Sequence, residues 1–232
     1  MPNKIAIVQP YFLPYLGYFQ LINAVDTFVL LDDVNFIKKG WINRNKIISN
    51  GREFTFTIPI KKASQNKKIN ELDTVNDLSL VKKQFIYSYK NSSYFDIHSK
   101  WLFSLLDNAP SNLLEFCHIS LSFIKEYLNI NTEFKLSSDI ANPKLLKGQD
   151  RIINICLDLE ANQYINPIGG MDIYNKSLFN ENGIELFFLK KNPVSYCQNT
   201  KVFIDNLSII DCLMNENSKT INNLLNHYEL VD

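Results

Sequence analysis

The chain has 232 residues, of which 46% are hydrophobic and 21% are charged, and its formal net charge is zero. This composition is ordinary for a soluble globular protein that buries a sizeable core, and the zero net charge gives no electrostatic basis for binding DNA or an anionic membrane surface. No apolar run is long enough to span a bilayer, and Gln9 and two prolines break the pattern of a signal peptide, so we expect a cytoplasmic protein.

Short runs of β type alternate with helical patterns along the chain. The expected strands are 5–8, 28–31, 54–60, 133–136, 164–165 and 185–189. The expected helices are 16–25, 78–89, 95–106, 113–128, 151–159 and 173–179. This alternation indicates an α/β fold with a mostly parallel, Rossmann-like sheet and helices on both faces. We expect one α/β domain over 1–232, with an aromatic-rich helical insertion at about 76–129.

Polar residues stand at the ends of the first two expected strands. Gln9 ends the first strand, and Asp32 and Asp33 end the second. Parallel sheets bind ligands beyond the carboxyl ends of their strands, so these side chains should meet over one crevice if the two strands are neighbours. Adjacent carboxylates are costly to desolvate without a task. The alternative is that the two aspartates cap the following turn.

The segment KKGWINRN, residues 38–45, follows the second strand and is dense in polar groups. Lys38 and Arg44 suit a phosphate, Asn43 suits sugar hydroxyls, and Trp41 suits stacking on a ring. Arg44 is one of only three arginines, which favours planar, bidentate recognition. The alternative is a surface turn in which Trp41 anchors into the core.

A second cluster lies in NPIGGMDIY, residues 166–174. Gly169 and Gly170 precede an expected helix, whose N-terminus would attract an anion, although the spacing matches no nucleotide-binding fingerprint. An ordinary strand-to-helix turn is an equal alternative. The lysine-rich loop 61–68 is expected to be a mobile, solvated face rather than a ligand site.

The cysteines and histidines form no recognisable motif. The four cysteines are far apart and have no zinc-ligand spacing, so no metal site is expected, and three of them are interpreted as core thiols. Each of the three histidines has a structural interpretation, and His98 is retained as the one candidate for catalysis.

These residues carry a resemblance. The segments QPYFLPYLGYF, AVDTFVLLDDVNFIKKGWINRNKI, YINPIGGMDIY and LSIIDCLMN are similar in content and order to the WbqC-like protein family, over essentially the whole chain. The positions that match the family pattern are Gln9, Pro10, Gly17, Tyr18, Asp32, Asp33, Trp41, Asn43, Arg44, Tyr164, Gly169, Tyr174 and Asp211. Asn35 departs from it, because a glutamine is expected there. The resemblance implies bacterial O-antigen or other surface-polysaccharide biosynthesis, with N-acylation of a nucleotide-linked amino sugar by an acyl or aminoacyl group such as glycyl.

PYLGYFQLI after the first strand also resembles the turn of nucleotidylyltransferases that carry an HxGH signature. Tyr15 and Tyr18 stand where those histidines would be, and residues 44–47 resemble the arginine-containing helix start that follows the second strand. A tyrosine supplies no imidazolium for a phosphoryl transition state, so nucleotidyl transfer is the second choice.

Three hypotheses follow. In the first, an acyltransferase uses Asp33 as the base and Asp32 to orient Lys38 or Arg44. Arg44 and the turn at Gly169 and Gly170 would then hold the pyrophosphate, and Trp41 or Tyr11 would stack on a ring. In the second, an adenylating enzyme holds ATP–Mg²⁺ on Asp32 and Asp33. In the third, the protein binds a sugar nucleotide without catalysis. No tightly bound cofactor is expected, and the sugar, the donor and the oligomeric state are left open.

Overall fold

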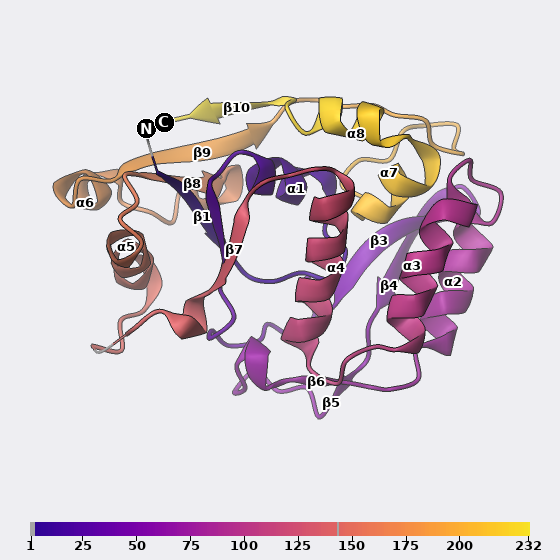
Figure 1. The fold of residues 1–232 in the computed structure, drawn as a ribbon, viewed down its shortest axis with the longest axis horizontal. Helices are drawn as coiled ribbons and strands as arrows, with labels where there is room; N and C mark the ends of the chain where they lie inside the picture. The colour runs from indigo at the N-terminus through magenta and orange to yellow at the C-terminus, as the bar shows by residue number, and fades with distance from the viewer. Residues whose placement is uncertain (1–2, 143) are drawn as a thin grey trace.

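Strands and helices alternate along most of the chain (Figure 1). The computed structural model describes residues 3–142 and 144–232. Its strands are β1 (Lys4–Val8), β2 (Thr27–Leu30), β3 (Arg44–Ser49), β4 (Arg52–Thr57), β5 (Ile60–Lys61), β6 (Asp73–Thr74), β7 (Glu133–Leu136), β8 (Gln163–Pro167), β9 (Glu185–Lys191) and β10 (Tyr228–Val231). Its α-helices are α1 (Leu16–Asn23), α2 (Ser79–Tyr89), α3 (Phe95–Asp107), α4 (Leu113–Tyr127), α5 (Gly148–Asp158), α6 (Lys176–Glu181), α7 (Ile209–Asn215) and α8 (Ser218–Leu224). Three short 3₁₀ helices are η1 (Ile69–Glu71), η2 (Ser137–Asp139) and η3 (Ile168–Gly170).

The central sheet contains six strands in the order β10, β9, β8, β1, β2 and β7. Neighbouring strands are parallel, except that β10 is antiparallel to β9. When only the strands of this sheet are counted along the chain, the order from β7 to β10 is 3-2-1-4-5-6, which is that of a doubly wound sheet. The predicted Rossmann-like sheet is therefore confirmed. Its winding reverses between β1 and β8, and such sheets bind ligands beyond the strand ends at this switch point.

Helices cover both faces of the sheet, as predicted. Successive side chains of a strand point to opposite faces, so Ala6 of β1 joins one hydrophobic cluster and Ile5 and Ile7 join another. The first cluster contains buried residues of α1, α4, α7 and α8, and the second contains those of α5 and α6. Each fully buried isoleucine or phenylalanine stabilises the fold by roughly 1.5–3 kcal/mol.

Strands β3 and β4 form a separate antiparallel hairpin. Two predictions from the sequence differ from it. Residues 54–60 were expected to form a strand of the sheet, but β4 pairs only with β3, outside the sheet. Residues 44–47, which were compared above with the start of a helix, belong to strand β3 instead. Asn50 and Gly51 join the two strands with φ angles of 52° and 70°, the left-handed backbone of a two-residue hairpin turn.

The region 76–129 is helical, as predicted, and supplies α2, α3 and α4. Helices α2 and α3 pack against each other, and α2 also contacts the β3–β4 hairpin. Helix α4 lies closer to the sheet and leads into β7 (Figure 1). Its Phe116 stacks on Phe12, with ring centroids 4.3 Å apart, so α4 packs on the loop that follows β1.

Within the part of the chain that the structure describes, no helix combines the length and the apolar character needed to cross a membrane. The interpretation of three cysteines as core thiols is confirmed, because Cys117, Cys156 and Cys212 are buried, whereas Cys197 is exposed. Burial raises the pKa of Cys156 to about 12, which keeps this thiol protonated near neutral pH.

Candidate functional site

A cleft of about 630 Å³ lies at the carboxyl end of the sheet. Asp33 follows β2 and Tyr174 follows β8, and both line the cleft together with Lys68, Lys147 and Arg151. We call it the strand-end cleft. Because β1 lies between β2 and β8, this cleft borders the switch point between β1 and β8. The expectation that Asp33 faces a crevice beyond the strand ends therefore agrees with its position.

Asp32 and Asp33 share one hydroxyl group. The Ser137 hydroxyl lies 3.0 Å from Oδ1 of Asp32, contacts Oδ1 of Asp33, and accepts the backbone N–H of Asp32 at 3.1 Å. Oδ1 of Asp32 also accepts the backbone N–H of Ser138 at 3.0 Å. Because a hydroxyl has one proton and Asp32 already has this second donor, we assign the Ser137 proton to Asp33.

Asp32 is fully buried, and protein groups occupy its oxygens. Its Oδ2 accepts the side-chain amide of Asn70 at 2.9 Å. The expectation that Asp32 orients Lys38 or Arg44 is wrong, because its side-chain contacts in the described residues are with Asn70, Ser137 and Ser138. Asp32 thus positions the segment that carries Asp33, whereas the Asp33 side chain is 20% exposed and faces the cleft.

Arg151 fixes the other side of Asp33. Its guanidinium lies 3.7 Å from Oδ2 of Asp33 and is almost fully buried. Nη2 donates to the carbonyls of Ser137 at 2.7 Å and Ile140 at 2.9 Å, and Nη1 donates to the carbonyl of Ala141 and the side chain of Asn154. Four hydrogen bonds therefore hold one cation against the carboxylate of Asp33.

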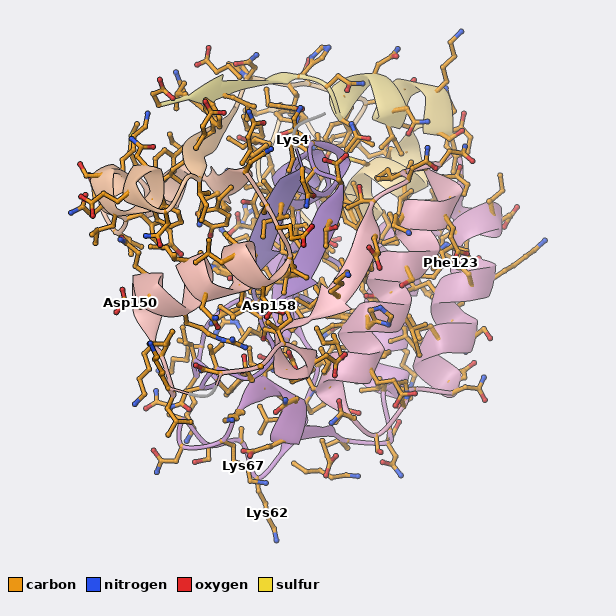
Figure 2. The ribbon with its side chains drawn as sticks, turned by 60° about the vertical axis from the view of Figure 1, so that its left-hand side comes forward. Lys4, Lys62, Lys67, Phe123, Asp150 and Asp158 are labelled. Carbon is orange, nitrogen blue, oxygen red and sulfur yellow. The ribbon has the colours of Figure 1, made fainter. Side chains whose placement is uncertain are left out.

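The rim of the strand-end cleft is cationic. Lys68 and Lys147 line it, and α5 begins beside them at Gly148, with no side-chain cap from the residues described. Figure 2 shows α5 between Asp150 and Asp158, lying across the sheet. An uncapped helix N-terminus with neighbouring lysines attracts phosphate groups. Lys62 of the 61–68 loop extends away from the molecule, as expected (Figure 2). Lys68, in contrast, lines the cleft.

The glycine pair adopts a different structure from the one expected. Gly169 and Gly170 lie in η3, and the following helix, α6, begins only at Lys176, after its Asn175 cap. The helix predicted at 173–179 therefore begins three residues later, at Lys176, and the N-terminus of α6 does not adjoin the glycines. A Cβ on Gly170 would lie 2.5 Å from Oδ1 of Asn166 and 3.1 Å from the Tyr174 ring, so this glycine permits close packing beside the cleft.

Trp41 and Tyr11 line a second cleft, of about 320 Å³, with Tyr15, Asn45, Lys46 and Asn206. We call it the aromatic cleft. Trp41 is 42% exposed, so it does not anchor the turn into the core. The Arg44 guanidinium carbon and the Lys46 ammonium lie 5.6 and 5.5 Å from the centre of the Trp41 ring, within cation–π range. Aromatic and cationic side chains are thus combined in this cleft, whereas Asp33 lines the strand-end cleft.

The remaining signature residues support the loops around these clefts. Tyr18 is buried and donates its hydroxyl to the Gln9 carbonyl at 2.9 Å. A Cβ on Gly17 would lie 2.5 Å from the Tyr15 ring, so Gly17 lets that ring lie over α1. Asn43 donates to the Ile58 carbonyl at 2.7 Å, a structural role rather than contact with a sugar.

Asp211 belongs to a third, buried network. Its carboxylate accepts the hydroxyls of Tyr89 at 2.9 Å and Tyr196 at 2.8 Å, and the amide of Gln198 at 3.1 Å. Burial raises its pKa, while these three donors oppose that shift. The network joins α2, α7 and the segment after β9.

His98 and Lys38 are not brought to either cleft. His98 is buried in α3, where its Nδ1 accepts the indole N–H of Trp101 at 3.1 Å and its ring packs edge-on against Tyr127. Burial lowers its pKa to about 4. Helix α3 lies on the opposite side of the molecule from α5 (Figure 1). His98 thus has a structural environment, and Lys38 is exposed in a turn.

Sequence reasoning treated Arg151 as a candidate for bidentate recognition but did not place it in the site, and it missed Ser137, Lys147 and the start of α5. Arg151 is one of the three arginines, which was a usable signal. Gly148 immediately before a helical pattern was another, because its φ of 54° is rarely adopted by other residues. No local pattern marked Ser137, whose role depends on β7 pairing with β2.

Comparisons with known proteins match most of the chain, including both clefts. A model of the WbqC-like protein family matches residues 9–223, which include both clefts' principal side chains. An uncharacterised protein of Mycobacterium tuberculosis, Rv1507c, is 28% identical over 219 residues, covering 92% of this chain and 94% of its own length. No solved structure matches the chain.

Proposed function

Since the chain belongs to the WbqC-like protein family, we propose that it is a transferase that acylates the amine of a nucleotide-linked amino sugar in bacterial surface-polysaccharide biosynthesis. The observation that carries the proposal is the strand-end cleft, where the carboxylate of Asp33 faces a rim of Lys68, Lys147 and the N-terminus of α5. One cleft thus offers a base and an anion site.

The cationic rim suits the diphosphate of a nucleotide-linked sugar. Lys68 and Lys147 supply charge, and the free N–H groups of the first turn of α5 supply directed donors. This replaces Arg44 and the glycine pair, to which the sequence assigned the diphosphate. Tyr174 at the β8 side offers an aromatic wall for a sugar ring.

Asp33 is the proposed general base. The sugar amine attacks the acyl carbonyl carbon, a C–N bond forms, and the bond from that carbon to the donor's leaving group breaks. Asp33 accepts the proton that the nitrogen loses, and the leaving group departs with the bonding electrons. Ser137 and Arg151 hold the carboxylate in one orientation, which lowers the cost of reaching the reactive geometry.

The adenylating alternative is less well supported. It needs Asp32 and Asp33 together as Mg²⁺ ligands, but Asp32 is fully buried and its two oxygens accept from the Asn70 amide and the Ser138 backbone N–H. Asp32 therefore does not fit the metal without losing these hydrogen bonds. We derive no step through Mg²⁺.

Asp33→Asn tests the proposal. It should abolish acyl transfer while calorimetry shows binding of UDP- or dTDP-linked amino sugars within about threefold of wild type, because the amide keeps the shape but takes no proton. Asp139→Asn, an exposed carboxylate in the same 3₁₀ helix as Ser137, is the matched control and should leave both properties unchanged. Normal turnover by Asp33→Asn would refute the assignment. Binding without turnover by the wild type, across thioester and adenylate donors, would favour a non-catalytic binding protein.

A further inference from the structure

The side chains picked from the sequence as one site divide between two clefts. Asp33 and Tyr174 line the strand-end cleft, and Tyr11 and Trp41 line the aromatic cleft. Across the described residues, the two clefts share no lining side chain. A transferase with two substrates needs two places for them, so the division has a functional interpretation.

The aromatic cleft has the chemistry of a nucleotide site. Tyr11, Tyr15 and Trp41 present rings on which a nucleobase stacks favourably. Lys46 lines the same cleft and, like Arg44, lies over the Trp41 ring, so two cationic side chains stand beside the stacking surface, although Lys46 also pairs with Glu53 at 3.0 Å. About 320 Å³ is at the lower end of the volumes of ligand pockets.

Arg44 adds a hydrogen-bonding argument. Its Nε is buried and has no hydrogen-bond partner among residues 3–142 and 144–232. A buried donor without a partner is unfavourable, and the Arg44 side chain has to move before a ligand acceptor reaches it. A guanidinium is also a planar donor group suited to a phosphate.

We infer that the aromatic cleft binds a nucleoside phosphate that carries the acyl group, separately from the nucleotide-linked sugar in the strand-end cleft. The inference rests on the proposed function for the identity of the second substrate. The base stacks on Trp41 and the tyrosines, Lys46 of the cleft lining holds the phosphate, and Arg44 lies beside them over the Trp41 ring.

The chain limits how far apart the clefts lie. Asn35 lines the strand-end cleft and Trp41 lines the aromatic cleft, six residues later. Six residues span at most about 22 Å when fully extended, so the two Cα atoms are no further apart than that. An acyl group on an extended carrier arm can cover such a distance, whereas a short mixed anhydride requires the clefts to be closer.

Trp41 fluorescence gives a direct test that needs no turnover. The chain has two tryptophans, and Trp101→Phe leaves Trp41 as the reporter. We expect coenzyme A or AMP to quench this emission saturably, and the two probes distinguish a thioester carrier from an adenylate. Arg44→Gln should weaken the binding at least tenfold, and Arg52→Gln, on the exposed strand of the same hairpin, should leave it unchanged. Circular dichroism confirms that each variant is folded.

The second arm adds a UDP- or dTDP-linked amino sugar, with UMP and dTMP as further probes. Additive binding, with coenzyme A or AMP affinity unchanged, supports two separate sites. Competition by the sugar nucleotide, or quenching by UMP and dTMP alone, would overturn the inference by making the aromatic cleft the base end of the acceptor site. No quenching by any probe would also overturn it. Asp33→Asn reports on turnover and on sugar-nucleotide binding, whereas Trp41 quenching reports on the aromatic cleft, so failure of the proposed function and failure of this inference give different results.

Discussion

The guanidinium of Arg151 lies 3.7 Å from the carboxylate of Asp33, and these two residues come from connections that are far apart in the chain. Asp33 follows β2, whereas Arg151 lies in the first turns of α5, the helix that leads from β7 to β8. Arg151 also donates to the carbonyls of Ser137, Ile140 and Ala141, so it ties α5 to the segment after β7. One side chain therefore sets both the place of α5 and the orientation of the proposed base.

Arg151→Lys should destabilise the protein by about 1–3 kcal/mol in urea denaturation. A lysine retains the charge but lacks the planar fork, so several of the carbonyls that Arg151 binds lose their donor. Turnover should fall as well, because Asp33 loses its fixed neighbour. Arg52→Lys, the same change at an exposed position of β4, is the control and should shift stability by less than about 0.5 kcal/mol. Equal stability of the two variants would mean that the Arg151 network is not formed.

Ser137→Ala tests whether one hydroxyl organises both aspartates. The substitution removes the acceptor of the buried Asp32 N–H and the donor to Asp33, so stability should fall by about 1–3 kcal/mol. The matched control is Ser138→Ala, because Ser138 reaches Asp32 only through its backbone N–H and its side chain is exposed. We expect thermal denaturation to separate the two alanine variants by several degrees. A Ser138→Ala protein that is as unstable as Ser137→Ala would contradict this assignment.

The fold followed from the sequence where periodicity was strong. Alternating strands and helices identified the parallel sheet, and the three helices of 76–129 lie within one or two residues of their predicted bounds. The hairpin was missed although Asn50-Gly51 is a strong turn signal, because Arg44 and its neighbours were compared with a helix start. The alternation of apolar and polar residues was weak in β3, because the buried Asn45 is polar. Its side chain is satisfied by donating to the Leu13 carbonyl.

The site was predicted in part. The position of Asp33 at a cleft was predicted because the end of a parallel strand is a general place for ligands, and that rule depends only on the order of elements. The segment that carries Trp41 was grouped with it because both follow β2, yet the chain leaves the strand-end cleft after Asn35 and reaches the aromatic cleft at Trp41. Arg151 and Ser137 could not be placed beside Asp33, because long-range pairing of β2 with β7 decides their positions.

His98 should make stability depend on pH below neutrality. Its folded-state pKa is about 4, and the ordinary imidazole value of about 6.5 applies when the chain unfolds, so the unfolded state binds the proton first. The contribution is present above pH 6.5 and is lost as the pH falls toward 4, by about 2 kcal/mol between pH 7 and pH 5.

His98→Phe removes this titration and should therefore flatten the stability profile between pH 7 and pH 5, as measured by urea denaturation at each pH. His118, whose pKa is also lowered by burial and by Lys125, remains in both proteins and contributes equally to both profiles. An unchanged slope in His98→Phe would show that the imidazole is accessible to protons in the folded state.

The adjacent glycines of η3 provide the last prediction, since they differ only in what surrounds them. A Cβ on Gly170 would lie 2.5 Å from Oδ1 of Asn166, which donates its amide to the Tyr164 hydroxyl at 2.6 Å, whereas a Cβ on Gly169 would meet no atom within 4 Å. Gly170→Ala should therefore displace Asn166 and the ring of Tyr174, lowering stability by about 1–3 kcal/mol and weakening binding in the strand-end cleft. Gly169→Ala is the matched control and should change neither property measurably. If Gly169→Ala instead abolished sugar-nucleotide binding while the fold persisted, the open space beside Gly169 would itself belong to the ligand site, because only an occupant of that space would meet the added methyl group.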